Sequence, residues 1–301
     1  MRIACIVPIF NFADDPIIEQ NHRRSVAALA EEPNVEVFPI RATLGDVGGP
    51  YWPDWESLPT DSVLWQKEAL INYAAEKLRR KYPVLAWVDS GLYLDPGWAE
   101  RLRLRIGLGF SVVQLYSRGV WLGKTGRQTS YRAGYLFYRE RHFPGRDKVQ
   151  LSGGKPKPSV GGAWAARSGV FGEIKLYDRA VTGGGDTWAL QGLAKVNTPE
   201  AIVTKYLQDT YRAHVQRWIK RARQVDLSAG WITGSYYHLW HTNQASRQHG
   251  TRHRVLVECD YNPARHTILR RNGLLDWTEE APAKLVDTVR EYLLSRAGAR
   301  L

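Results

Sequence analysis

The sequence has 301 residues and 44% hydrophobic content, enough to bury a real core in one large domain or in one domain with an extension. Two cysteines, Cys5 and Cys259, exclude a disulfide framework and a zinc-binding spacing. The opening MRIACIVPIF is too short for a signal peptide, and no stretch approaches the roughly 20 apolar residues of a membrane span. We therefore expect a soluble, cytoplasmic protein.

The formal net charge is +12 and the isoelectric point is about 9.7. A basic excess of this size favours a polyanionic partner such as a nucleic acid, an acidic lipid surface or an acidic polymer. The alternative is a basic surface that serves only solubility and the binding of a nucleotide phosphate. The 12 tryptophans and 15 tyrosines suit stacking on either sugars or bases.

The first elements predict an α/β sheet. Residues 3–7 form a continuous apolar run typical of a buried parallel strand, and Pro8 is expected to end it. Helical spacing follows over residues 19–30, and a second strand is predicted over 35–40. This strand–helix–strand order favours an α/β fold, while the lack of a GxGxxG pattern argues against a dinucleotide site.

The next elements carry two candidate donor-binding residues. After a glycine- and proline-rich loop over 47–59, a helix is predicted over 62–81, with Lys67 placed to contact a diphosphate or simply to face solvent. A strand over 83–88 ends in Asp89, at the strand end where α/β folds bind ligands. Asp95 is expected to cap a helix over 96–104.

After a strand predicted over 110–116, the segment 117–158 is basic, aromatic and broken by glycine and proline, so it is expected to form loops. That composition suits a surface that follows phosphates and stacks bases, or a solvated basic loop. Its basic residues are Arg118, Lys124, Arg127, Arg132, Arg139, Arg141, Arg146, Lys148, Lys155 and Lys157.

The stretch 159–188 has glycines at both ends, Gly161-Gly162 and Gly183-Gly184-Gly185. Successive glycines allow positive φ and a close approach to a ligand. Asp186 follows them where a helix should start, so it is expected to cap that helix and to serve as a general base. The alternative is a glycine turn with an ordinary capping aspartate.

The remaining chain predicts helices over 204–223, 244–257 and 283–295, the first two of them basic. Between the first two lie His238 and His241, three residues apart. Both could reach one metal ion only on a helix, because in an extended segment they point to opposite faces. One ligand is favoured, and the choice between the two stays open.

Six segments occur in an order that resembles the GT-A glycosyltransferases, of the family-2-like kind: VPIFN, WQKEALIN, WVDSG, GGAW, GGGD and HLWHT. The layout is most similar to bacteriophage DNA-base glycosyltransferases and base-J-type glucosyltransferases. The resemblance implies a Rossmann-like, mostly parallel central sheet flanked by helices. It divides the chain into a catalytic domain over 1–200, with a basic insertion at 117–158, and a helical basic extension over 201–301.

The resemblance also assigns roles to residues. Asp186 stands in the place of the acid that deprotonates the acceptor hydroxyl, and Asp89 with His238 or His241 would hold Mn²⁺ or Mg²⁺. Residues around an NDP-sugar, such as UDP-glucose or a similar UDP-sugar, would be Pro8, Phe10, Asn11, Arg41, Lys67, Asn72, Asp89, Gly161, Gly162, Trp164, Gly184 and Gly185.

One position departs from the family pattern, because Gly91 replaces the last acid of the DxD motif. Either Asp89 and a histidine hold the metal, or catalysis uses less metal, or activity has been lost. The expected function is inverting sugar transfer to a hydroxymethylated pyrimidine, such as 5-hydroxymethylcytosine, in double-stranded DNA. The rivals are a polysaccharide, lipid or protein acceptor, and a non-catalytic binding protein.

Overall fold

The computed structural model describes residues 1–45, 56–144, 157–196, 209–241 and 251–296. Within these ranges the largest sheet has seven strands in the order β10-β6-β9-β4-β1-β2-β3. The strands are β1 (Ile3–Phe10), β2 (Val35–Leu44), β3 (Glu56–Thr60), β4 (Val84–Val88), β6 (Val112–Gln114), β9 (Ala163–Arg167) and β10 (Ala229–Trp231).

The strands of this sheet run mostly in one direction. Strand β1 pairs in parallel with β2 and β4, β2 pairs in parallel with β3, and β10 pairs in parallel with β6. Strand β9 runs against both of its neighbours, β4 and β6. The carboxyl ends of β1 and β4 therefore lie at one edge of the sheet, and the predicted α/β fold is confirmed.

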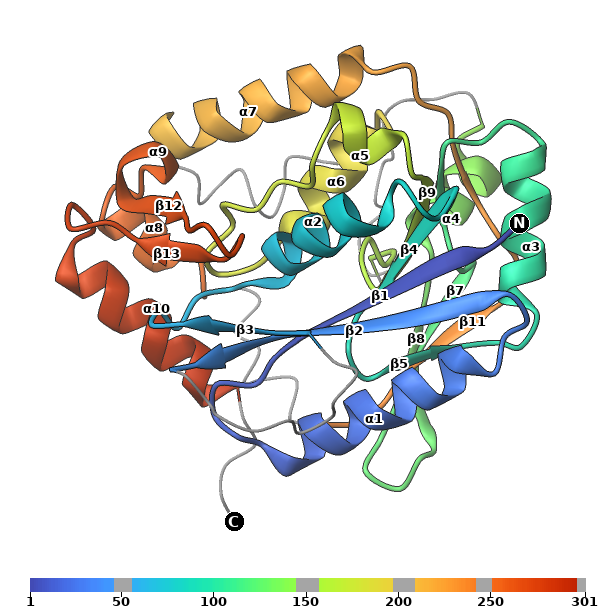
Figure 1. Ribbon diagram of the computed structural model, residues 1–301, viewed down its shortest axis with the longest axis horizontal. Helices are drawn as coiled ribbons and strands as arrows, with labels where there is room; N and C mark the ends of the chain where they lie inside the picture. Colours follow the sequence, from blue (N-terminus) through green and yellow to red (C-terminus); the bar gives the residue numbers. More distant parts are fainter. Residues whose placement is uncertain (46–55, 145–156, 197–208, 242–250, 297–301) are drawn as a thin grey trace.

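Helices cover both faces of the sheet (Figure 1). One face carries α1 (Pro16–Ala30) and α3 (Trp98–Gly107), and the other carries α2 (Lys67–Leu78), α5 (Val170–Glu173) and α6 (Gly185–Leu193). In β1, Ile3 and Cys5 pack on the first side, whereas Ala4 and Ile6 pack on the second. Because successive side chains point to opposite faces, a strand buried on both sides needs an unbroken apolar run.

A smaller sheet has the strand order β5-β11-β7-β8. Its strands are β5 (Leu92–Leu94), β11 (Ser235–His238), β7 (Arg118–Leu122) and β8 (Gln128–Ala133), and α4 (Tyr135–His142) follows β8. The expectation of loops over 117–158 was thus wrong for residues 118–142, while 145–156 lie outside the described residues. The strands are short and partly exposed, and β7 pairs with a strand more than a hundred residues away.

The C-terminal part is mainly helical but also contributes β10 and β11 to the two sheets. Its further elements are α7 (Asp209–Gln224), α8 (Arg254–Glu258), α9 (Pro263–His266), β12 (Thr267–Leu269), β13 (Leu275–Trp277) and α10 (Ala283–Ser295). These elements pack around Trp188 of α6 in a separate apolar cluster. The parts of the predicted helices that cover 204–208 and 244–250 lie outside the described residues.

Several predicted boundaries were wrong for local reasons. Strand β1 continues through Pro8, because pairing with β4 has ended at Ile6 and only the β2 ladder remains there. Helix α1 begins at Pro16, because Asp15 Oδ1 accepts a hydrogen bond from the Ile17 amide at 2.8 Å. Helix α3 begins at Trp98, and Asp95 accepts from the Ser235 amide instead of capping it.

Helix α2 begins at Lys67, five residues later than predicted. The preceding residues are held by partners distant in sequence: Ser62 Oγ donates to Asp276, and the Gln66 side chain pairs with both backbone groups of Leu275. No helix among the residues placed by the structure combines the length and apolar content needed to cross a bilayer.

Candidate active site

Two carboxylates and one ammonium meet where β4 ends and two helices begin. Lys67, the first residue of α2, lies 2.7 Å from Asp89 Oδ1 and 2.8 Å from Asp186 Oδ1. Asp89 directly follows β4, and Asp186 lies in the first turn of α6. The Lys67 side chain is 6% exposed, whereas Asp89 and Asp186 are 34% and 24% exposed, so both carboxylates reach the surface.

Charge pairing keeps Lys67 protonated. Burial alone would lower the pKa of its ammonium, but the Asp186 and Asp89 carboxylates outweigh burial and raise the pKa well above its usual value. The sequence predicted all three residues as site residues, and the fold brings them together from positions 119 residues apart. The alternative that Lys67 is a solvent-exposed helix residue was wrong, because its side chain is 6% exposed.

Asp186 does not cap α6 as predicted. The N-cap is Gly184, with φ of 104°, and no side chain bonds to the free amides at this position. Asp186 lies one residue inside the helix, where a negative charge is favourable beside the helix N-terminus. Its carboxylate therefore does not bond to the helix amides and instead accepts from Lys67, with Oδ2 at 2.9 Å from Nζ.

The glycines around Asp186 make room for the protein's own side chains. A Cβ atom at Gly161 would lie 2.3 Å from Asp186 Oδ2, and one at Gly185 would lie 2.3 Å from Glu68 Oε1. A Cβ at Gly183 would lie 3.1 Å from the Trp65 ring. The glycine-rich ends thus serve internal packing around the acid, a role that the sequence interpretation did not foresee.

We predict that Gly161→Ala displaces Asp186. Gly161 has no positive φ, so the effect is steric contact with the carboxylate and not backbone strain. We expect a destabilisation of about 1–3 kcal/mol, because the added methyl group forces the carboxylate to move. Urea unfolding measures this loss. The matched control is Gly107→Ala, where a Cβ meets nothing within 4 Å, and equal behaviour of the two variants would contradict the prediction.

Glu68 is a neighbour that the sequence analysis missed. It is 4% exposed, accepts a hydrogen bond from Trp65 Nε1 at 2.9 Å, and its Oε1 atom has no hydrogen-bond partner among the described residues. Burial raises its pKa to about 8, against 4.5 ordinarily. The first six residues of α2 are all buried, so sequence spacing gives no sign of which charged residue faces the interior. Only the tertiary structure, which places Gly185 of α6 against Glu68, reveals that Glu68 is buried.

We predict that Glu68 makes the fold less stable at alkaline pH. Its pKa is raised in the folded state, so the folded state binds the proton more tightly, and stability falls as pH rises from about 4.5 through about 8. Glu68→Gln cannot lose this proton. At pH 9 we expect the free energy of unfolding of this variant to exceed that of the wild type by about 1–3 kcal/mol, as measured by urea unfolding. At pH 5 we expect little difference.

The control for that measurement is Glu76→Gln, on the same helix but with 46% of the side chain exposed and paired with Arg79. It should not change the pH dependence. A Glu68→Gln variant whose stability keeps the wild-type slope between pH 5 and pH 9 would show that Glu68 titrates normally.

The predicted donor residues at the end of β1 have mixed environments. Phe10 lies edge-on to Trp65, with ring centroids 5.1 Å apart, and so borders the same site. The Asn11 side chain donates from Nδ2 to the Asp15 carbonyl and accepts at Oδ1 from the Asp15 amide. Arg41 forms a bidentate pair with Glu19 at 2.6 and 2.8 Å. The side chains of Asn11 and Arg41 therefore bond to residues at the start of α1.

Five other predicted donor residues lie within the protein's own packing. Pro8 is buried within β1. Asn72 is buried and bonds with both backbone groups of Leu176, and Trp164 is buried with Nε1 donating to the Val160 carbonyl. Gly162, with φ of 104°, accepts from the Asp89 amide at 2.7 Å and so positions that acid. Gly184, discussed above, faces the His253 ring.

The two predicted metal-binding histidines lie close to the loop after Asp89. Leu239, between them, donates its amide to the Gly91 carbonyl, and the two histidine rings are 5.3 Å apart. Within the described ranges, no group of three or more His, Cys, Asp or Glu side chains could hold a metal ion. Asp89 and Asp186 instead share the Lys67 ammonium. The described residues at this place therefore do not fit a divalent ion.

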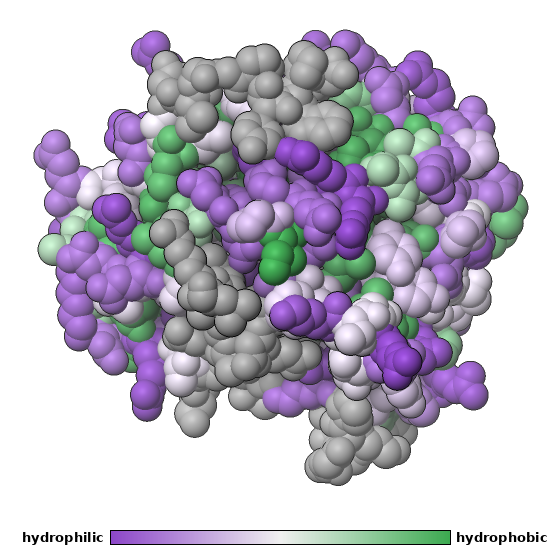
Figure 2. All heavy atoms as spheres, turned by 90° about the horizontal axis from the view of Figure 1, so that it is seen from below, coloured by the Kyte–Doolittle hydropathy of each residue, from purple (hydrophilic) through white to green (hydrophobic). Residues whose placement is uncertain are grey.

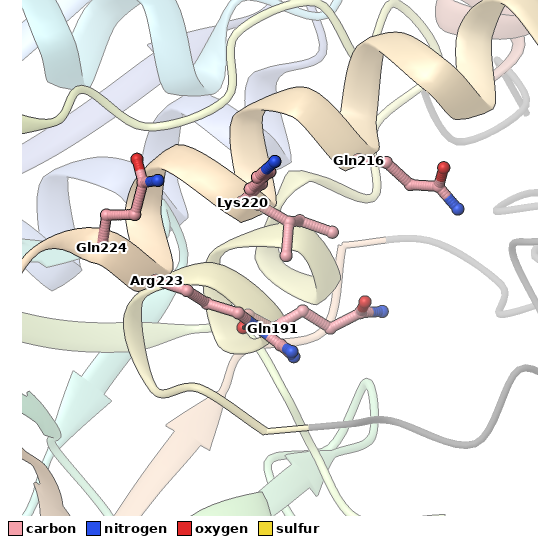
Figure 3. A pocket seen from close by; sticks show the side chains of 6 residues that line it. Gln191, Gln216, Lys220, Arg223 and Gln224 are labelled. Carbon is pink, nitrogen blue, oxygen red and sulfur yellow. Dashed lines mark hydrogen bonds between the residues drawn. The ribbon is translucent and has the colours of Figure 1, made fainter.

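A hollow of about 490 Å³ lies elsewhere, between α6 and α7 (Figure 3). Its lining is amide and cationic: Gln191, Gln216, Ile219, Lys220, Arg223 and Gln224. It contains neither a carboxylate nor any of the predicted site residues, so the carboxylate cluster and not this hollow is the candidate active site.

No protein-family model and no curated protein matches this chain. Among solved structures, S. aureus TarS has a TM-score of 0.44 and 11% identity, covering 80% of this chain and 37% of that chain. S. aureus TarS 1-349 has a TM-score of 0.43 and 11% identity, covering 98% and 71%. The same protein in complex with UDP-GlcNAc has a TM-score of 0.39 and 11% identity, covering 81% and 60%. At TM-scores below 0.5 these likenesses assign no activity to this chain.

Proposed function

We propose that this chain transfers a sugar from an NDP-sugar, of the UDP-sugar class, to an acceptor hydroxyl. The observation that carries the proposal is the Asp89–Lys67–Asp186 cluster at the carboxyl ends of parallel strands. This edge is where open α/β sheets bind nucleotides. The ordered segments VPIFN to HLWHT, which resemble GT-A glycosyltransferases, support the same function.

In the proposed reaction Asp186 is the general base. Its carboxylate takes the proton of the acceptor hydroxyl as that oxygen bonds to the anomeric carbon. The bond from the anomeric carbon to the diphosphate breaks in the same step, and the nucleoside diphosphate leaves with its electron pair. Attack from the face opposite the leaving group inverts the anomeric configuration. Lys67 orients Asp186 and pairs with Asp89 beside the donor.

The proposed acceptor is DNA that carries a hydroxymethylated pyrimidine. Support comes from the net charge of +12 and from cation–aromatic contacts on the smaller sheet. Arg132 lies 5.2 Å from the Trp121 ring centre, and that ring stacks on His238 at 6.2 Å. Hydrophilic side chains also predominate on the face seen in Figure 2. A surface with basic and aromatic side chains can bind DNA phosphates and stack on bases. A base flipped out of the duplex would present its hydroxymethyl group to the site.

The test is incubation with a panel of UDP-sugars and DNA containing 5-hydroxymethylcytosine, followed by nucleoside mass spectrometry. Glycosylated nucleoside supports the proposal, and parallel reactions with Mn²⁺, Mg²⁺ or EDTA measure any metal requirement. Transfer that proceeds without DNA would assign a polysaccharide, lipid or protein acceptor instead. Absence of transfer and of donor hydrolysis in every reaction would leave a binding protein and overturn the proposal.

A further inference from the structure

Two arginines from the C-terminal part of the chain flank Trp65 at the rim of the carboxylate site. The guanidinium carbon of Arg296, the residue after α10, lies 4.7 Å from the Trp65 ring centre. The guanidinium carbon of Arg252, just before α8, lies 6.0 Å from the same ring centre. No sequence pattern singled out either residue as part of the site.

Neither guanidinium has a carboxylate partner among the described residues. Arg252 donates to the ring nitrogen Nε2 of His253 at 3.2 Å and to the Tyr292 hydroxyl at 3.3 Å. Neither acceptor is a carboxylate. The Arg296 guanidinium lies over the rings of Trp65 and Tyr292, and no ion pair of it is seen within the described part of the chain. Burial lowers the pKa of Arg296, and the nearby Arg252 charge lowers it further. A negatively charged ligand would relieve this unfavourable arrangement.

Trp65 fixes both arginines beside the donor site. Its ring packs against Gly183 and lies edge-on to Phe10 at the end of β1. It also donates to Glu68, the neighbour of Lys67. The Asp89 carboxylate is close enough to raise the pKa of Arg296. Through Trp65, the arginines thus lie near the cluster of Asp89, Lys67 and Asp186.

The charges around this rim favour an anionic ligand. Lys67, Arg252 and Arg296 are positive, Asp89 and Asp186 are negative, and Glu68 is mostly protonated at neutral pH because its pKa is about 8. Counted over these described groups, one positive charge is left over before any ligand binds. Guanidinium groups offer paired donors that match phosphate oxygens, and such charge-assisted hydrogen bonds are strong.

We propose that Arg252 and Arg296 bind the diphosphate of the nucleotide-sugar donor and stabilise the negative charge that develops as it leaves. This inference rests on the proposed sugar transfer. It assigns to two arginines the neutralising role for which the resemblance implied a metal ion, at a site where Lys67 already occupies both acids.

The test measures binding of inorganic pyrophosphate and of UDP by calorimetry in EDTA. Arg252→Gln and Arg296→Gln should each weaken binding of both ligands about tenfold, and the double variant more. Arg296→Lys, which keeps the charge, should lose less. The control is Arg290→Gln, an exposed arginine on α10, which should bind as the wild type does. Thermal melts verify that each variant is folded.

The outcomes separate this inference from sugar transfer itself. Wild-type pyrophosphate affinity in the double variant would overturn the inference, whether or not sugar is transferred. The inference would also be overturned if the wild type bound neither ligand. The same holds if binding required Mn²⁺ and was unchanged by both substitutions. Arginine-dependent pyrophosphate binding without transfer from any donor would support the inference and remove the proposed enzyme activity.

Discussion

Asp186→Asn is expected to abolish sugar transfer while leaving donor binding intact. Asparagine keeps the size of the side chain and one oxygen that can accept from the Lys67 ammonium. In the wild type this ammonium lies 2.8 Å from Asp186 Oδ1. It cannot accept the proton of the acceptor hydroxyl. Loss of a general base lowers turnover by roughly 10²–10⁴-fold, so we expect kcat to fall by about 10³-fold with little change in donor KM.

The matched control for this substitution is Asp209→Asn. Asp209 also pairs with a basic residue, Arg212, but its side chain is 99% exposed at the start of α7. It should leave transfer unchanged. If Asp186→Asn turns over within about threefold of the wild type, the assignment of the base is wrong, and a melting curve distinguishes lost chemistry from lost folding.

Lys67→Met is expected to have the largest effect on stability. Methionine fills a similar volume but leaves Asp89 and Asp186 without the ammonium that both contact. Removing one partner of a buried ion pair costs about 3–5 kcal/mol, and the partial exposure of the two acids places the expected loss at about 3 kcal/mol. Urea unfolding at pH 7 measures this loss.

The pH dependence of the Lys67→Met variant tests the cause. Without Lys67 the two carboxylates repel one another when both are ionised, and protonation removes that repulsion. The deficit relative to the wild type should therefore be larger at pH 8 than at pH 5. The control is Lys77→Met on the same helix, where the exposed pair with Glu56 should be worth less than about 1 kcal/mol. Equal losses in the two variants would show that Lys67 is not specially stabilising.

The candidate site could be predicted in part because some of its signals are local. Asp89 follows an apolar run that must be a buried strand, and Asp186 follows three glycines, so each acid could be placed at the end of an element. The buried strands were readable for the same reason, since a strand covered on both faces shows an unbroken apolar run. Residues that act through packing carry no such signal. Glu68, Trp65, Arg252 and Arg296 are unremarkable in sequence.

By itself the sequence determined the α/β class, the strand end and the helix start that carry the two acids, and the basic charge of the chain. Only the tertiary structure decided that Lys67 joins Asp89 to Asp186, that the glycines accommodate internal side chains, and that strands near residue 120 pair with one near residue 236. The physical reason is range. Hydrophobic periodicity reports burial within one element, whereas charge pairing and steric fit depend on which elements the fold brings together.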